Sequence, residues 1–85
     1  MPKLPRVKGA EVIRALERLG FVRVRQRGSH VILKKQLPPD NGENSEEIIE
    51  IGCVVPLHSK TLATGTLKSI LKQAEVSVEE FLMNL

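Results

Sequence analysis

The segment that most restricts the fold of this chain is residues 23–35, which read RVRQRGSHVILKK. Polar and apolar side chains alternate through residues 21–27, as in a β-strand whose successive side chains point to opposite faces. Gly28-Ser29 is a turn signal, and the β-branched and aliphatic run of residues 31–35 favours a second strand. The segment therefore predicts a β-hairpin.

The predicted hairpin sorts its side chains by chemistry. Its first strand has valines on one face and arginines on the other, namely Val22 and Val24 opposite Arg23, Arg25 and Arg27. Ser29 and His30 follow at the bend, and Lys34 lies on the second strand. We expect the exposed face of the sheet to carry the arginines together with His30.

The flanking segments predict helices and a third strand. Apolar residues recur at three- and four-residue spacing in residues 8–20, which predicts an amphipathic helix that ends at Gly20. Further elements are a strand at residues 48–57, a helix at 65–74 capped by Thr64, and a short helix that Ser77 opens. Consecutive antiparallel strands with helices on one face give an α+β two-layer sandwich, and 85 residues fit one domain, residues 1–85.

The chain has a single cysteine, Cys53, which excludes an internal disulfide and the zinc sites built from several cysteines. Its apolar neighbours favour a small buried residue; the alternative is a reactive thiol, although no basic neighbour in sequence would lower its pKa. The sequence contains no signal peptide and no apolar run approaching about 18 residues. We therefore expect a cytoplasmic protein that does not contact a membrane.

Charge is unevenly distributed along the chain. The net charge is +3, yet the basic residues concentrate in residues 1–35, and residues 40–50 carry acidic side chains without a basic one. This asymmetry favours a polyanionic partner for one face, with chance clustering as the alternative. The acidic segment, residues 36–47, predicts a long loop between the second and third strands.

His30 is the main catalytic candidate, because imidazole accepts or donates a proton near neutral pH. An endoribonuclease needs a base for the ribose 2′-hydroxyl or an acid for the leaving 5′-oxygen, and cations that stabilise charge on the phosphate. The same hairpin supplies such cations in Arg23, Arg25, Arg27 and Lys34. The alternative is a histidine that only completes the turn through a hydrogen bond.

Other residues near the predicted hairpin are secondary candidates. Gly28 shapes the bend, and Ser29 either positions a phosphate or completes the turn. His58 is either a second acid–base group or a residue that fixes the connector after the third strand, and Lys60 extends the positive surface. The acidic segment lacks the spacing and bidentate glutamate of a calcium loop, so we expect no metal and no cofactor.

Several blocks of the sequence resemble those of HicA toxins. They are KGAEVIRALERLGF (residues 8–21), RGSH (27–30), VPLH (55–58), GTLKSILKQA (65–74) and SVEEFL (77–82). The resemblance covers nearly the whole chain, and the order and spacing of the blocks make it specific. One departure is the acidic segment, which is longer than the short turn expected there.

The resemblance implies a fold similar to the double-stranded RNA-binding domain, with a three-stranded antiparallel sheet packed on two helices and a short C-terminal helix. It implies ribosome-independent, metal-free cleavage of mRNA and neutralisation by a cognate HicB antitoxin, with no DNA binding by the toxin alone. The catalytic histidine of the family corresponds to His30. The acidic segment would then either reshape substrate access or contact the antitoxin.

Three functions follow from these patterns. We favour a toxin endoribonuclease; the alternatives are a non-catalytic RNA-binding module of the double-stranded RNA-binding type and a structural adaptor that docks onto another protein. Only the first produces RNA fragments, and only the first two bind RNA with an affinity that weakens steeply as salt rises.

Overall fold

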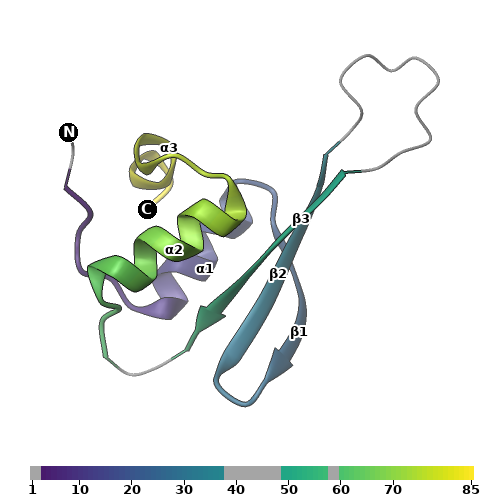
Figure 1. Ribbon diagram of the computed structural model, residues 1–85, viewed down its shortest axis with the longest axis horizontal. Helices are drawn as coiled ribbons and strands as arrows, with labels where there is room; N and C mark the ends of the chain where they lie inside the picture. Colours follow the sequence, from purple (N-terminus) through teal and green to yellow (C-terminus); the bar gives the residue numbers. More distant parts are fainter. Residues whose placement is uncertain (1–2, 38–48, 58–59) are drawn as a thin grey trace.

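The computed structural model describes residues 3–37, 49–57 and 60–85. The elements are α1 (Gly9–Arg18), β1 (Val22–Arg27), β2 (His30–Leu37), β3 (Ile49–Pro56), α2 (Thr64–Ala74) and α3 (Val78–Met83). The strands form one antiparallel sheet in the order β1-β2-β3, and the helices lie to one side of it (Figure 1). This arrangement confirms the predicted α+β fold, which is consistent with that of a double-stranded RNA-binding domain.

The core lies between the helices and one face of the sheet. Alternate residues of β2 and β3 are buried there: Val31, Leu33, Ile51, Cys53 and Val55. They form one apolar cluster with side chains of α1 and α2, and with Phe81 of α3, which is fully buried. No polar or charged residue is buried in the part of the chain that the structure describes. The stability of the fold therefore depends on apolar burial.

The transition from α1 to β1 follows the predicted glycine signal. Gly20 has a φ of +103°, a conformation that L side chains rarely adopt. The Gly20 N–H donates to the Glu17 carbonyl at 3.1 Å and the Phe21 N–H to the Leu16 carbonyl at 3.0 Å, which is the Schellman pattern. The chain therefore reverses within two residues and buries Phe21 beneath the start of β1.

The sequence predicted the N-cap residues of α2 and α3, and one of these two predictions is confirmed while the other is wrong. Ser77 caps α3 as predicted, because its hydroxyl accepts the Glu80 N–H at 3.1 Å. Thr64 does not cap α2; Ala63 occupies the N-cap position and Thr64 is the first helical residue. The predicted N-cap is therefore displaced by one residue. Ala63 has the extended backbone of an N-cap but no side-chain acceptor.

Some predictions concern residues outside the described ranges. Most of the acidic segment, residues 38–47, is among them, as are Ile48 and His58. Within the described ranges, no helix is long and apolar enough to cross a membrane.

Of the two interpretations of Cys53, the structure supports the buried apolar residue. Its side chain is buried on the core face of β3, and this burial raises the pKa of the thiol to about 11. We expect the native thiol to react with iodoacetamide at pH 8 far more slowly than the thiol of the denatured chain, because little reactive thiolate is present and the core covers it. Mass spectrometry over time measures both rates, and equal rates would contradict the burial.

Candidate nucleic-acid interface

The bend between β1 and β2 is held from both sides. Gly28 has a φ of +55° and Ser29 a negative one, the sign pattern of a two-residue type II′ hairpin turn. The Gln26 side chain donates to the Gly28 carbonyl at 3.0 Å, and the Leu57 N–H, just beyond β3, donates to the Ser29 carbonyl. The residue that follows the bend, His30, therefore starts from a fixed backbone position.

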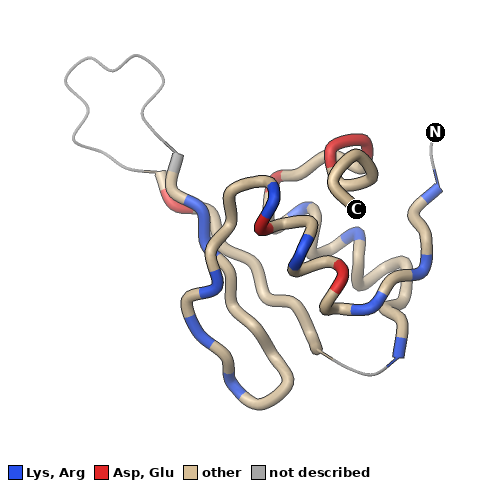
Figure 2. Tube along the Cα trace, turned by 180° about the vertical axis from the view of Figure 1, so that it is seen from behind, with Lys and Arg blue, Asp and Glu red and all other residues tan. Residues whose placement is uncertain are grey.

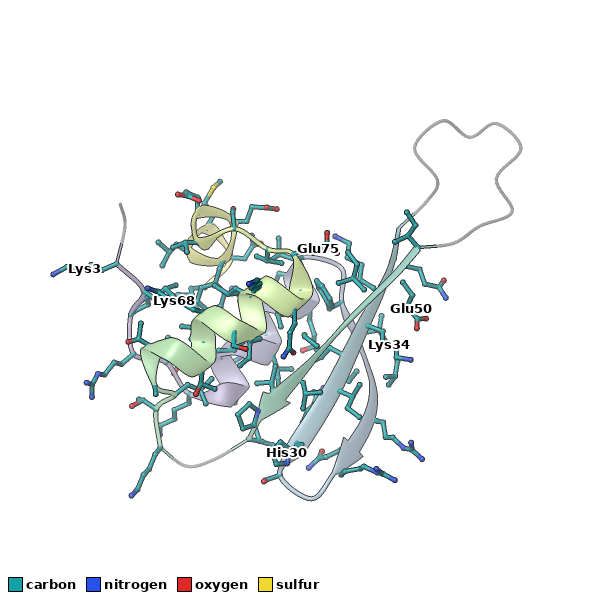
Figure 3. All side chains as sticks on the ribbon, viewed as in Figure 1. Lys3, His30, Lys34, Glu50, Lys68 and Glu75 are labelled. Atoms are coloured by element: carbon teal, nitrogen blue, oxygen red, sulfur yellow. The ribbon has the colours of Figure 1, made fainter. Side chains whose placement is uncertain are left out.

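His30 is exposed at this end of the sheet (Figure 3). It is paired with Arg27 of β1 on one side and with Pro56 of β3 on the other. Because Val31 is buried on the helix side, the alternation of the strand turns His30 to the outer face. The imidazole is therefore accessible to a ligand that lies across the outer face of the sheet.

The sequence predicted that the three arginines of β1 share one face, and this prediction is wrong. The pairing of β1 with β2 shifts between Arg23 and Arg25, so Val24 is an extra residue in a β-bulge. Arg25 and Arg27 pair with Ile32 and His30 and lie on the outer face. Arg23 is turned to the helix side, where its Nε lies 3.6 Å from a carboxylate oxygen of Glu17 on α1.

Lys34 lies on the outer face but is not part of the group around His30. It is four residues further along β2, which corresponds to roughly 13 Å. Its Nζ lies 3.1 Å from a carboxylate oxygen of Glu50, and Figure 3 shows this pair well up the sheet from His30. The structure therefore brings together His30, Arg25 and Arg27, and separates Lys34 and Arg23 from them.

The secondary candidates have unequal support. Gly28 and Ser29 form the bend, with Ser29 half-buried. Lys60 is exposed just before Thr61, which pairs with Lys8 at the start of α1. Among the described residues, no group of three or more His, Cys, Asp or Glu side chains is placed to hold a metal ion.

The outer face of the sheet suits a sugar–phosphate backbone better than stacked bases. The chain has no Trp and no Tyr, and both phenylalanines, Phe21 and Phe81, are buried. An aromatic platform for bases is therefore missing from the described surface. Guanidinium groups, which bind phosphate through several N–H donors, flank the histidine instead.

Two supporting residues of this region were not predicted from the sequence. Glu17, on α1, holds Arg23, and Gln26 braces the bend. The first contact depends on the bulge, for which the sequence of β1 carries no glycine or other marker. The second had a local signal, because Gln26 lies two residues from the carbonyl that it binds.

The close approach of α1 to the end of β3 supports the site from behind. Gly9, the first residue of α1, is buried, and a Cβ there would overlap the carbonyl oxygen of Pro56. Pro56 is the strand partner of His30. The absence of a side chain at Gly9 therefore sets how closely α1 approaches the strand beside the histidine.

The small α+β fold thus carries an exposed histidine and the guanidinium groups of Arg25 and Arg27 on one face of its sheet. A profile of the HicA toxins of bacterial toxin–antitoxin systems matches residues 9–76 of the 85-residue chain. The chain belongs to this family, and thus to toxins that generally cleave RNA and pair with an antitoxin. The search of curated proteins found no match.

Gly9→Ala tests the close approach of α1. We expect it to lower the free energy of unfolding by roughly 1–3 kcal/mol, because the methyl group forces the Pro56 carbonyl and α1 apart. The matched control is Gly65→Ala at the start of α2, where a Cβ meets nothing within 4 Å. Urea denaturation of both variants measures the difference, and equal stability would show that the approach can relax without cost.

Proposed function

We propose that this chain is a ribosome-independent endoribonuclease that cleaves mRNA, with His30 as the group that moves the proton. The observation that carries the proposal is the exposed position of His30 on the outer face, beside its strand partner Arg27 and two pairs along the sheet from Arg25. A cognate antitoxin of the HicB type neutralises the toxin by covering this face with acidic side chains. These details go beyond membership of the family.

The chemistry proceeds by attack of the ribose 2′-oxygen on the neighbouring phosphorus. His30 takes the proton from the 2′-hydroxyl while water protonates the leaving 5′-oxygen, or, in its protonated form, it gives a proton to the 5′-oxygen while water takes the 2′-hydroxyl proton. The new O2′–P bond forms as the P–O5′ bond breaks, so the products are a 2′,3′-cyclic phosphate and a 5′-hydroxyl. Arg25 and Arg27 stabilise the negative charge that grows on the phosphoryl oxygens.

The backbone supports this role for His30 because the bend is preorganised. Proton transfer needs the imidazole within hydrogen-bonding reach of the reacting oxygen. The Gln26 and Leu57 hydrogen bonds to the turn carbonyls fix the strand that carries the histidine. The side chain then has only its own rotamers to sample when RNA binds.

His30→Ala tests the catalytic assignment. We expect RNA cleavage to fall by about 10²–10⁴-fold, because the proton transfer loses its acid–base group. RNA binding and the thermal midpoint should remain, since the replaced side chain is exposed. A gel of labelled RNA incubated in EDTA measures cleavage, and an RNA with one 2′-deoxyribose at the cut site serves as the uncleavable control. Undiminished cutting by the variant would disprove the assignment; absence of cutting by the parent chain would favour a binding module.

Because of the β-bulge, we expect replacement of Arg23 to affect cleavage differently from replacement of Arg25 or Arg27. Arg25→Ala and Arg27→Ala should each lower kcat/KM by roughly 10–100-fold, because each removes a cation from the face of His30. Arg23→Ala removes the same charge from the same strand but from the opposite face, where Glu17 already pairs with it. Single-turnover kinetics on one RNA of defined sequence compare the three variants. An equal loss in all three would mean that net charge alone matters.

A further inference from the structure

We infer that RNA extending beyond the His30 bend crosses the solvent-exposed side of α1, where Arg14 and Arg6 bind its phosphates. This inference rests on the proposed function, because it takes the bend as the place where the strand is cut. It assigns a second contact region, distinct from the hairpin, to α1 and to residues 3–7 before it, which we call the lead-in segment. The catalytic chemistry uses neither.

The region is a hollow of about 430 Å³ between the lead-in segment, α1 and the C-terminal residues. Three guanidinium side chains line it: Arg6 from the lead-in, and Arg14 and Arg18 one turn apart on α1. The lead-in segment is anchored at Val7, next to Arg6. The Val7 side chain is buried, and its carbonyl accepts the Leu62 N–H at 2.7 Å. The arginines therefore lie on a fixed surface.

Of the two glutamates of α1, Glu17 is engaged away from the hollow, whereas Glu11 lines it. A carboxylate oxygen of Glu11 accepts the Lys8 N–H at 3.1 Å, and Glu17 pairs with Arg23 at 3.6 Å. Arg18 donates to the Asn84 carbonyl at 2.8 Å. Within the described ranges, Arg14 and Arg6 have neither an ion pair nor a hydrogen bond. Glu11 also lines the hollow, which therefore combines three guanidinium groups with a glutamate carboxylate and keeps a net positive charge.

Arg14 links the hollow to Leu57, a residue whose backbone binds the bend. The side chain of Arg14 also lines a second, smaller hollow of about 220 Å³, together with Arg23 and Leu57. Leu57 is the residue whose N–H binds the Ser29 carbonyl, directly before His30. Figure 2 shows the same succession from behind, with basic residues along β1, α1 and the lead-in segment. A strand leaving the bend therefore meets cations along this path.

A polyanionic strand fits this path better than an acidic protein does. Interfaces between proteins are usually anchored by apolar or aromatic side chains. Of the exposed large hydrophobic residues of the described chain, none lies on α1 and only Leu85 borders the hollow. The remaining attraction is that of separated cations, which is the sequence-independent way in which proteins hold a phosphate backbone.

The test uses the full chain with His30→Ala, so that bound RNA stays intact. Fluorescence anisotropy measures binding of single-stranded RNAs of about 6 and about 24 nucleotides, of which only the longer reaches past the bend. The variant combines Arg6→Ala with Arg14→Ala. Lys68→Ala with Lys72→Ala is the matched control, since it removes two exposed cations one turn apart on α2.

We expect the arginine variant to bind the longer RNA about tenfold more weakly. The plot of the logarithm of its binding constant against the logarithm of salt concentration should become shallower by about 1.4, the value for two lost phosphate contacts. Its binding of the shorter RNA and both affinities of the lysine control should stay unchanged. Equal losses in the two double variants, or an equal loss for both RNA lengths, would overturn the inference. So would poly-glutamate competing with the longer RNA as effectively as unlabelled RNA does.

A failure of this inference can be told apart from a failure of the proposed function. Cleavage by the chain with His30 intact is measured in parallel. Cutting by that chain, with no effect of the arginine changes on binding, would disprove the path across α1 alone. Length-dependent binding through α1, without cutting by the parent, would disprove the nuclease alone.

Discussion

Burial of one face of the sheet is the constraint on which the site depends. Val31 and Leu33 of β2 are completely buried against the helices, and successive residues of a strand point to opposite faces. A slip of one residue in the pairing would move them to solvent and carry His30 into the core. The apolar core therefore fixes the exposure of the histidine, although His30 is not itself part of the buried cluster.

Local signals in the sequence were sufficient for most of the fold. The apolar spacing of α1, the glycine after it and the serine before α3 each act within a few residues, and each predicted the correct feature. The face of Arg23 could not be predicted in this way. A bulge is a property of two paired strands, and the alternation within β1 alone contains no information about where its pairing shifts.

The same limit applies to the candidate site. The outward position of His30 follows from the apolar residues after it, and the sequence was sufficient to predict it. The grouping of cations around it depends on long-range partners: Glu17, on α1, holds Arg23, and Glu50, on β3, holds Lys34. These partners are 6 and 16 residues away, respectively, which is beyond the reach of strand periodicity.

The two glutamates also shape the electric field of the surface. Each pairs with a cation that lies away from His30, which leaves Arg25 and Arg27 at the bend and Arg14 on α1 without a carboxylate partner among the described residues. Like charges so placed repel one another and destabilise the free protein, and a bound polyanion removes that repulsion. A ligand that binds only the folded state also stabilises it. Under the proposed function, RNA and the acidic side chains of an antitoxin compete for the arginines at the bend, which gives a simple physical basis for neutralisation.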